Sequence, residues 1–96
     1  MVKLSWSEQG SADLEEIYRY LSRESGKQTA ANIYKRIRNS TKRLIQQPES
    51  CPFYLDPIRR LVIKGLPYSL YYEFCDDTVN ILAVRHEKRT PLDSEY

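Results

Sequence analysis

The stretch that most constrains the fold is residues 59–91, RRLVIKGLPYSLYYEFCDDTVNILAVRHEKRTP. It contains three short apolar runs, separated by the turn signals GLP at 65–67 and DD at 76–77. Apolar residues recur at every second position of the last two runs, which is the period of a half-buried strand. Short alternating runs divided by turn residues predict an antiparallel meander, with a tight hairpin at 76–77.

Two helices are expected before this meander. Ser7 is a candidate N-cap, because its hydroxyl can accept a bond from a backbone N–H of the first turn. One apolar face of the first helix is marked by residues at i, i+3, i+4 and i+7: Leu14, Ile17, Tyr18 and Leu21. A second helix is predicted over residues 28–47 and ends before Pro48. The break at Gly26 is short, so the two helices form an antiparallel hairpin.

The flanking segments complete the predicted order. Residues 2–6 alternate like a strand, whereas residues 48–57 carry three prolines and are expected to form a surface loop. The prediction is an α+β fold of order β-α-α-β-β-β, an antiparallel sheet with the N-terminal helical hairpin packed on one face. At 96 residues, the chain is expected to form a single domain over residues 1–91, followed by a polar tail at 92–96.

Several classes of function are disfavoured by composition. No apolar run approaches the ~20 residues that span a bilayer, and the N-terminus lacks a signal-peptide core, so we expect a cytoplasmic protein without membrane contact. Cys51 and Cys75 are too far apart for a CxxC pair and are expected to be reduced. With a single histidine and no phosphate-binding or nucleophile motif, we expect no metal, no cofactor and no small-molecule ligand.

Positive charge is concentrated in the second predicted helix. Residues 8–25 are mainly acidic, whereas residues 27–47 contain six lysines and arginines and no carboxylate. A helix of one sign attracts a polyanion or an acidic partner protein, although a solvated face beside an acidic helix is an equal alternative. Lys35, Arg38 and Lys42 are our candidates for contact with an acidic partner.

A second basic group lies at the ends of the meander. Arg59 and Arg60 open its first strand and point to opposite faces, while Arg85, His86 and Arg89 follow its last strand. These five are the candidate target-binding residues. We expect folding to gain little from them, because they lie outside the apolar pattern.

Such a surface also allows an enzymatic interpretation. Cations and tyrosines around a groove can cleave RNA without metal, with His86 as the acid or base. The alternatives are that His86 is a surface or capping residue, that the tyrosines pack across strands, and that Arg59 and Arg60 cover apolar surface.

The order and spacing of several short motifs resemble the RelE/ParE superfamily of bacterial toxins. The motifs are LSWS at 4–7, DLxxI at 13–17, LxxxP at 44–48, RRL at 59–61, YxLxY at 68–72, VxILxV at 79–84 and RHxxRxP at 85–91. The resemblance implies the toxin of a type II toxin–antitoxin system, which a cognate antitoxin wraps and neutralises.

The two branches of that superfamily imply different targets. RelE-like members cut mRNA on the ribosome and use an arginine directly after the tyrosine of the third strand, with another arginine near the C-terminus. In this chain Ser69 follows Tyr68, and Glu87 falls roughly where the C-terminal arginine is expected. ParE-like members poison DNA gyrase and have no catalytic set.

We therefore favour a ParE-like inhibitor of DNA gyrase that is not an enzyme. Two alternatives stay open. One is a metal-independent, ribosome-dependent mRNA endoribonuclease that uses His86, with the ribosome and mRNA as partners. The other is a protein-interaction module without toxicity.

Overall fold

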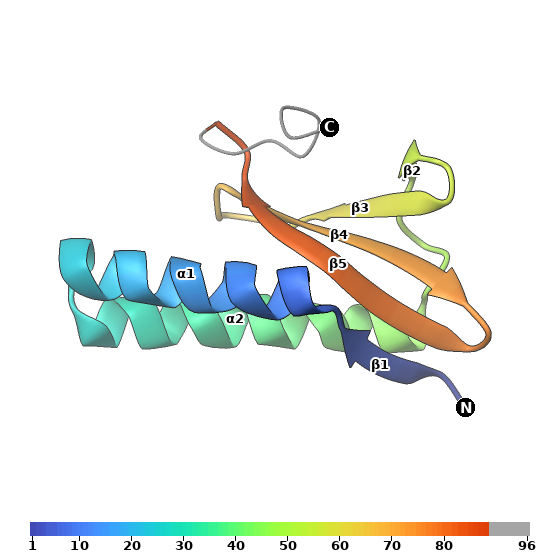
Figure 1. Ribbon diagram of the computed structural model, residues 1–96, viewed down its shortest axis with the longest axis horizontal. Helices are drawn as coiled ribbons and strands as arrows, with labels where there is room; N and C mark the ends of the chain where they lie inside the picture. Colours follow the sequence, from blue (N-terminus) through green and yellow to red (C-terminus); the bar gives the residue numbers. More distant parts are fainter. Residues whose placement is uncertain (89–96) are drawn as a thin grey trace.

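The computed structural model describes residues 1–88, which form two helices and a five-stranded sheet (Figure 1). The predicted tail at 92–96, and with it Arg89, lies outside the described residues. The elements are β1 (Lys3–Trp6), α1 (Glu8–Ser25), α2 (Lys27–Gln46), β2 (Phe53–Leu55), β3 (Ile58–Val62), β4 (Tyr68–Cys75) and β5 (Thr78–His86).

The predicted α+β class is confirmed, with two differences in the sheet. The strand order is β1-β5-β4-β3-β2, and β1 runs parallel to β5, with Leu4 opposite Val79. The sheet is therefore mixed, although all other neighbours are antiparallel. The second difference is β2, which lies inside the loop expected at 48–57. Its three residues pair only with β3, at the edge of the sheet, where neighbouring prolines are tolerated.

The helical hairpin covers one face of the sheet (Figure 1). The Ser7 hydroxyl accepts from the Gly10 N–H at 2.9 Å, so the predicted N-cap is confirmed. Gly26 separates the helices with φ +91°, a conformation that L side chains rarely adopt. The second helix begins and ends one residue earlier than predicted.

The main core lies between the helices and the sheet. Its fully buried members come from both layers: Ile37 and Leu44 of α2, Leu70 and Tyr72 of β4, and Val79 and Ile81 of β5. The Tyr72 hydroxyl donates to the Pro48 carbonyl at 2.9 Å, and burial raises the pKa of Tyr72 above its usual value. This bond attaches the chain between α2 and β2 to the core.

The opposite face of the sheet carries a smaller apolar cluster. Tyr71 and Ala83 are buried there, and Tyr54 and Ile58 pack against them. The rings of Tyr54 and Tyr71 meet edge-on with centroids 5.0 Å apart. The packing role expected for the β4 tyrosines is thus confirmed, because Tyr68, Tyr71 and Tyr72 are each at most 3% exposed.

Candidate functional site

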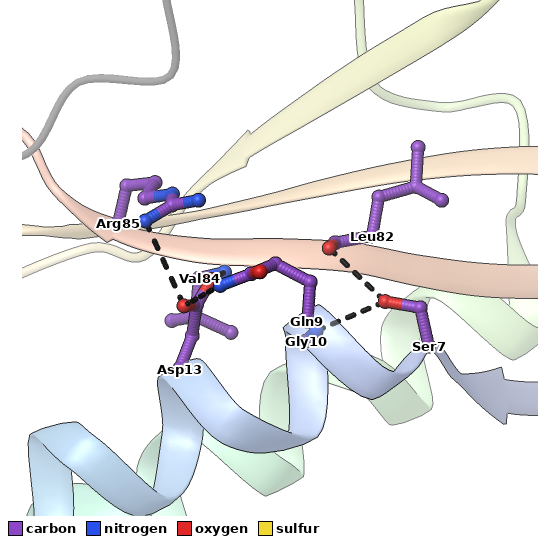
Figure 2. A network of polar contacts seen from close by, with 7 residues as sticks. All are labelled: Ser7, Gln9, Gly10, Asp13, Leu82, Val84 and Arg85. Atoms are coloured by element: carbon purple, nitrogen blue, oxygen red, sulfur yellow. Dashed lines mark hydrogen bonds and ion pairs between the residues drawn. The ribbon is translucent and has the colours of Figure 1, made fainter. Parts of the chain in front are cut away.

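Beyond the end of β1, the start of α1 forms hydrogen bonds with the edge of β5. The β4–β5 register shifts because Tyr71 is opposite Ala83 and Tyr72 is opposite Ile81, which leaves Leu82 as a bulge residue. The Ser7 hydroxyl donates to the Leu82 carbonyl at 3.1 Å (Figure 2), and the Ser7 N–H donates to the Ile81 carbonyl at 2.9 Å. Backbone groups that the ladder leaves open are thereby paired.

The close approach of α1 to β5 depends on Gly10. This glycine is buried, and a Cβ at its position would lie 2.6 Å from the Ile81 carbonyl oxygen. Side-chain atoms are not found that close to a backbone oxygen, so any larger residue forces the helix and strand apart.

One turn further along α1, Asp13 forms a buried ion pair with Arg85 of β5 (Figure 2). Asp13 Oδ1 lies 3.6 Å from Arg85 Nη1, and the two side chains are only 10% and 8% exposed. Asp13 also accepts from the Val84 N–H at 3.0 Å and from the Gln9 amide at 2.7 Å. Arg85 therefore lies within the fold and not on an exposed target-binding surface, and its effect on stability stays a prediction. This cation is buried because α1 places a carboxylate opposite it.

The end of β5 holds the residues on which an enzymatic function depends. The His86 ring packs edge-on against its cross-strand neighbour Tyr68, with centroids 5.4 Å apart. His86 Nδ1 accepts from the Lys88 N–H at 3.2 Å. Next to this pair, the fully buried Ser69 donates from its hydroxyl to Glu87 Oε1 at 2.6 Å. A hydroxyl and a carboxylate thus meet where the resemblance to RelE-like nucleases implies cations.

A hollow of about 200 Å³ separates α1 from the end of β5. Two carboxylates, Asp13 and Glu16, contribute to its wall, and Arg85 is already paired with Asp13. An RNA phosphate entering here would meet the exposed Glu16 carboxylate. The lining residues are Asp13, Glu16, Ile17, Tyr20, Val84, Arg85 and His86.

Arg59 and Arg60 have different surroundings, as their alternation predicts. Arg59 Nη1 donates to the carbonyls of Cys51 at 2.7 Å and Glu49 at 3.2 Å, and its guanidinium lies 4.0 Å from the Phe53 ring centroid. Arg59 therefore fixes the segment that leads into β2.

Arg60 lies on the other face of the sheet. It is opposite Tyr71, and its guanidinium stacks 5.8 Å from the ring centroid of Tyr54. Its side chain is half-buried, and its neighbour in the same orientation on β3, Val62, is 50% exposed.

The target-binding candidates consequently do not form one patch. Arg85 is buried in an ion pair, Arg59 is bound to loop carbonyls, and His86 packs against Tyr68. Arg60 is the candidate whose position on the outer face suits contact with another molecule.

The three partner-binding candidates of α2 are all exposed, as predicted. Arg38 lies over two aromatic rings, 5.8 Å from the centroid of Trp6 and 5.9 Å from that of Tyr34. Its Nη1 also donates to the Tyr34 hydroxyl at 3.3 Å. Arg38 is thus held in place, whereas the structure assigns no such contact to Lys35 or Lys42 within residues 1–88.

Residues 1–88 contain neither a membrane-spanning helix nor a cluster of metal ligands. Neither α1 nor α2 has the length and apolar character that crossing a bilayer requires. Across residues 1–88, histidine, cysteine and carboxylate side chains do not gather in groups of three or more that would hold a metal ion.

Two residues of this region were missed from the sequence. Asp13 shares the helix face of Ile17, four residues later, so an acidic residue on the apolar stripe was the available signal for a buried pair. Trp6 was assigned to a half-buried strand, but its place beneath Arg38 depends on the packing of two helices against β1 and has no local signal.

Comparison with known proteins assigns the chain to a family. The family model described as "ParE toxin of type II toxin-antitoxin system, parDE" matches residues 4–91. Since this match covers most of the chain, the protein belongs to the ParE toxin family of type II toxin–antitoxin systems. The resemblance to the RelE/ParE superfamily and the preference for its ParE-like branch are confirmed.

Solved structures agree on the fold. A chain titled "Chromosomal ParDE TA system from P. aeruginosa" superposes with a TM-score of 0.82 at 24% identity, covering 90% of this chain and 96% of that one. The isolated E. coli RelE toxin gives 0.66 at 15% identity, covering 99% and 94%. The intact E. coli RelBE complex gives 0.66 at 14% identity, covering 93% and 100%. No curated protein matches the sequence significantly.

Proposed function

We propose that this toxin acts in the cytoplasm on DNA gyrase, without cutting RNA, and that a cognate antitoxin neutralises it. The observation that carries the choice of target is the Ser69–Glu87 hydrogen bond of 2.6 Å at the end of the sheet. Cleavage of RNA needs positive charge beside the pentavalent phosphate. A hydroxyl bound to a carboxylate supplies none, and the carboxylate repels the phosphate.

The outer face of the sheet suits a protein target better than RNA. Arg60 stacks on Tyr54 and shares its face with the exposed Val62. Arginine and tyrosine beside apolar surface are the residue types that dominate protein–protein interfaces. We therefore place the gyrase-binding surface around Arg60, and Arg89, by its sequence position after β5, stays a second candidate.

The test compares two reactions in parallel. The purified toxin is added to DNA supercoiling by gyrase and, separately, to translating ribosomes whose mRNA ends are mapped. We expect inhibition of supercoiling and intact mRNA. Codon-dependent mRNA cleavage that disappears in His86→Ala would overturn the proposal and make His86 the acid or base. Activity in neither assay would favour an interaction module without toxicity.

A pair of variants locates the target surface. Arg60→Ala is expected to weaken gyrase inhibition roughly tenfold. An arginine contact that is desolvated in a complex contributes more binding free energy than an arginine contact that stays exposed to water. Arg23→Ala, in the last turn of α1, removes the same charge from an exposed position away from the sheet and is expected to keep full inhibition. Equal inhibition by both variants would place the surface elsewhere.

The antitoxin is expected to present an acidic, amphipathic segment to α2. The motive is the exposed row of Lys35, Arg38 and Lys42 on a helix without carboxylates. Co-expression of a tagged toxin with the adjacent reading frame, followed by affinity purification, tests this. A toxin that emerges alone while both chains are made would contradict it.

A further inference from the structure

A second hollow lies between β1, α1 and α2, on the side of the helical hairpin that carries Arg38. Its volume is about 350 Å³, and its walls are mostly apolar and aromatic. The lining residues are Trp6, Ser11, Leu14, Glu15, Tyr18, Tyr34 and Arg38. The Tyr18 and Tyr34 rings meet edge-on with centroids 5.8 Å apart, so two helices contribute one aromatic wall.

The charge at the mouth of this hollow has no carboxylate partner within residues 1–88. Arg38 stacks on Trp6 and Tyr34, and within residues 1–88 no carboxylate forms an ion pair with it. Glu15, the one carboxylate of the lining, is bound to Arg19 instead. A positioned arginine over aromatic rings is therefore ready to accept a carboxylate from outside the chain.

One residue of the lining, Trp6, carries a buried hydrogen-bond donor that no acceptor within residues 1–88 satisfies. This donor is the Trp6 indole N–H. Buried donors are ordinarily paired in folded proteins, so this N–H marks a place where a bound partner can supply an oxygen.

We propose that this hollow, built by Trp6, Tyr18, Tyr34 and Arg38, is the anchor pocket for the acidic antitoxin segment. An apolar side chain of the segment fills the aromatic hollow, while a nearby carboxylate binds the Arg38 guanidinium. Aromatic residues and arginine in a pocket are the usual hot spots of an interface. This inference rests on the proposed function. It narrows the antitoxin-binding site from the basic helix α2 to one pocket.

The chain offers a matched control for the test. Arg38 and Arg43 lie on the same helix, both are exposed, and both lose one charge on change to alanine. Arg43 lines a different hollow, together with β3 residues. A partner attracted by charge alone responds equally to the two changes, whereas a partner seated in the anchor pocket responds to one.

The experiment titrates the toxin with the protein encoded by the adjacent reading frame, purified separately, and measures Kd by calorimetry. Arg38→Ala is expected to raise Kd at least about tenfold and Arg43→Ala less than about threefold. Arg38→Lys keeps the charge but replaces the planar guanidinium with an ammonium group. This variant is expected to lose most of the affinity that Arg38→Ala loses. Each variant is first checked for an unchanged Tm, and the lysine variant serves if alanine impairs folding.

The second measurement uses Trp6 as the chain's one tryptophan. Its indole N–H gives a single cross-peak in the ¹H–¹⁵N NMR spectrum, which is expected to shift on binding as the N–H gains an acceptor. Binding that leaves this peak unmoved and is weakened equally by Arg38→Ala and Arg43→Ala would overturn the anchor pocket but keep the antitoxin proposal. No binding at all would overturn both.

Discussion

The two edges of the sheet, here called its closed side and its open side, differ in how far other parts of the chain cover them. On the closed side, formed by β1 and the start of α1, Ser7 donates to the Leu82 carbonyl, and Asp13 accepts from the Val84 N–H and pairs with buried Arg85 (Figure 2). On the open side, formed by β2 and β3, Phe53 is 50% exposed and Leu55 is 68% exposed. Within the sheet, β2 lies at the opposite edge from β1 (Figure 1).

This difference separates arginines that look alike in the sequence. A cation on the closed side is desolvated and must be paired, so it serves folding. On the open side, Arg60 stays partly in contact with water beside the exposed Val62, as is typical of a binding surface. Arg59, on the other face of the same strand, is instead bound to the Cys51 and Glu49 carbonyls. The contacts around each arginine, rather than the residue type, therefore indicate which arginine is available to a partner.

The largest expected loss of stability comes from a substitution at Asp13 on the closed side. Asp13→Ala leaves the Arg85 charge buried without its carboxylate, and we expect the free energy of unfolding to fall by about 4 kcal/mol in urea denaturation. Glu15→Ala, which removes an exposed i,i+4 pair with Arg19, should change it by less than about 0.5 kcal/mol.

A double variant sharpens this result. Asp13→Ala combined with Arg85→Met also removes the buried cation, so part of the lost stability should return. If Asp13→Ala alone cost less than about 1 kcal/mol, Arg85 would not be a folding residue and its burial would have little energetic consequence.

The next effect concerns the approach of α1 to β5. Glycine to alanine inside a helix ordinarily stabilises by up to about 1 kcal/mol. At Gly10 the added Cβ would lie 2.6 Å from the Ile81 carbonyl oxygen, so we expect a loss of about 3 kcal/mol instead. The exposed neighbour Ser11→Ala is the control and should be nearly neutral. A more stable Gly10→Ala protein would show that the closed side tolerates separation.

The closed side was harder to predict from the sequence than the helices and the hairpins. Helix faces and the β4–β5 turn follow from local patterns, and Asp76 and Asp77 indeed adopt φ 52° and 56°, as a tight hairpin requires. The Asp13–Arg85 pair joins residues 72 positions apart, which no local pattern connects. It forms because β1 runs parallel to β5 and ends before it, so α1 meets the remaining edge.

The candidate site was predicted in part for the same reason. Alternation correctly placed Arg59 and Arg60 on opposite faces, and helical spacing correctly left Lys35, Arg38 and Lys42 exposed. Which of these cations has a stacking or hydrogen-bonding partner depends on contacts between elements. The anchor pocket beneath Arg38, for example, requires Trp6 of β1 to meet Tyr34 of α2.

The smallest expected effect tests the open side with two adjacent arginines. Arg59→Ala removes two bonds to loop carbonyls and the stacking on Phe53, so we expect the free energy of unfolding to fall by about 2 kcal/mol. Arg60→Ala removes only a stacked, half-buried cation and should cost less than about 0.5 kcal/mol. Both values come from the same urea titrations. Because the two residues share a strand and a charge, a difference in stability reflects the contacts that each side chain makes. Equal losses would mean that Arg60 also serves the fold, and the proposed target surface would then lose its central residue.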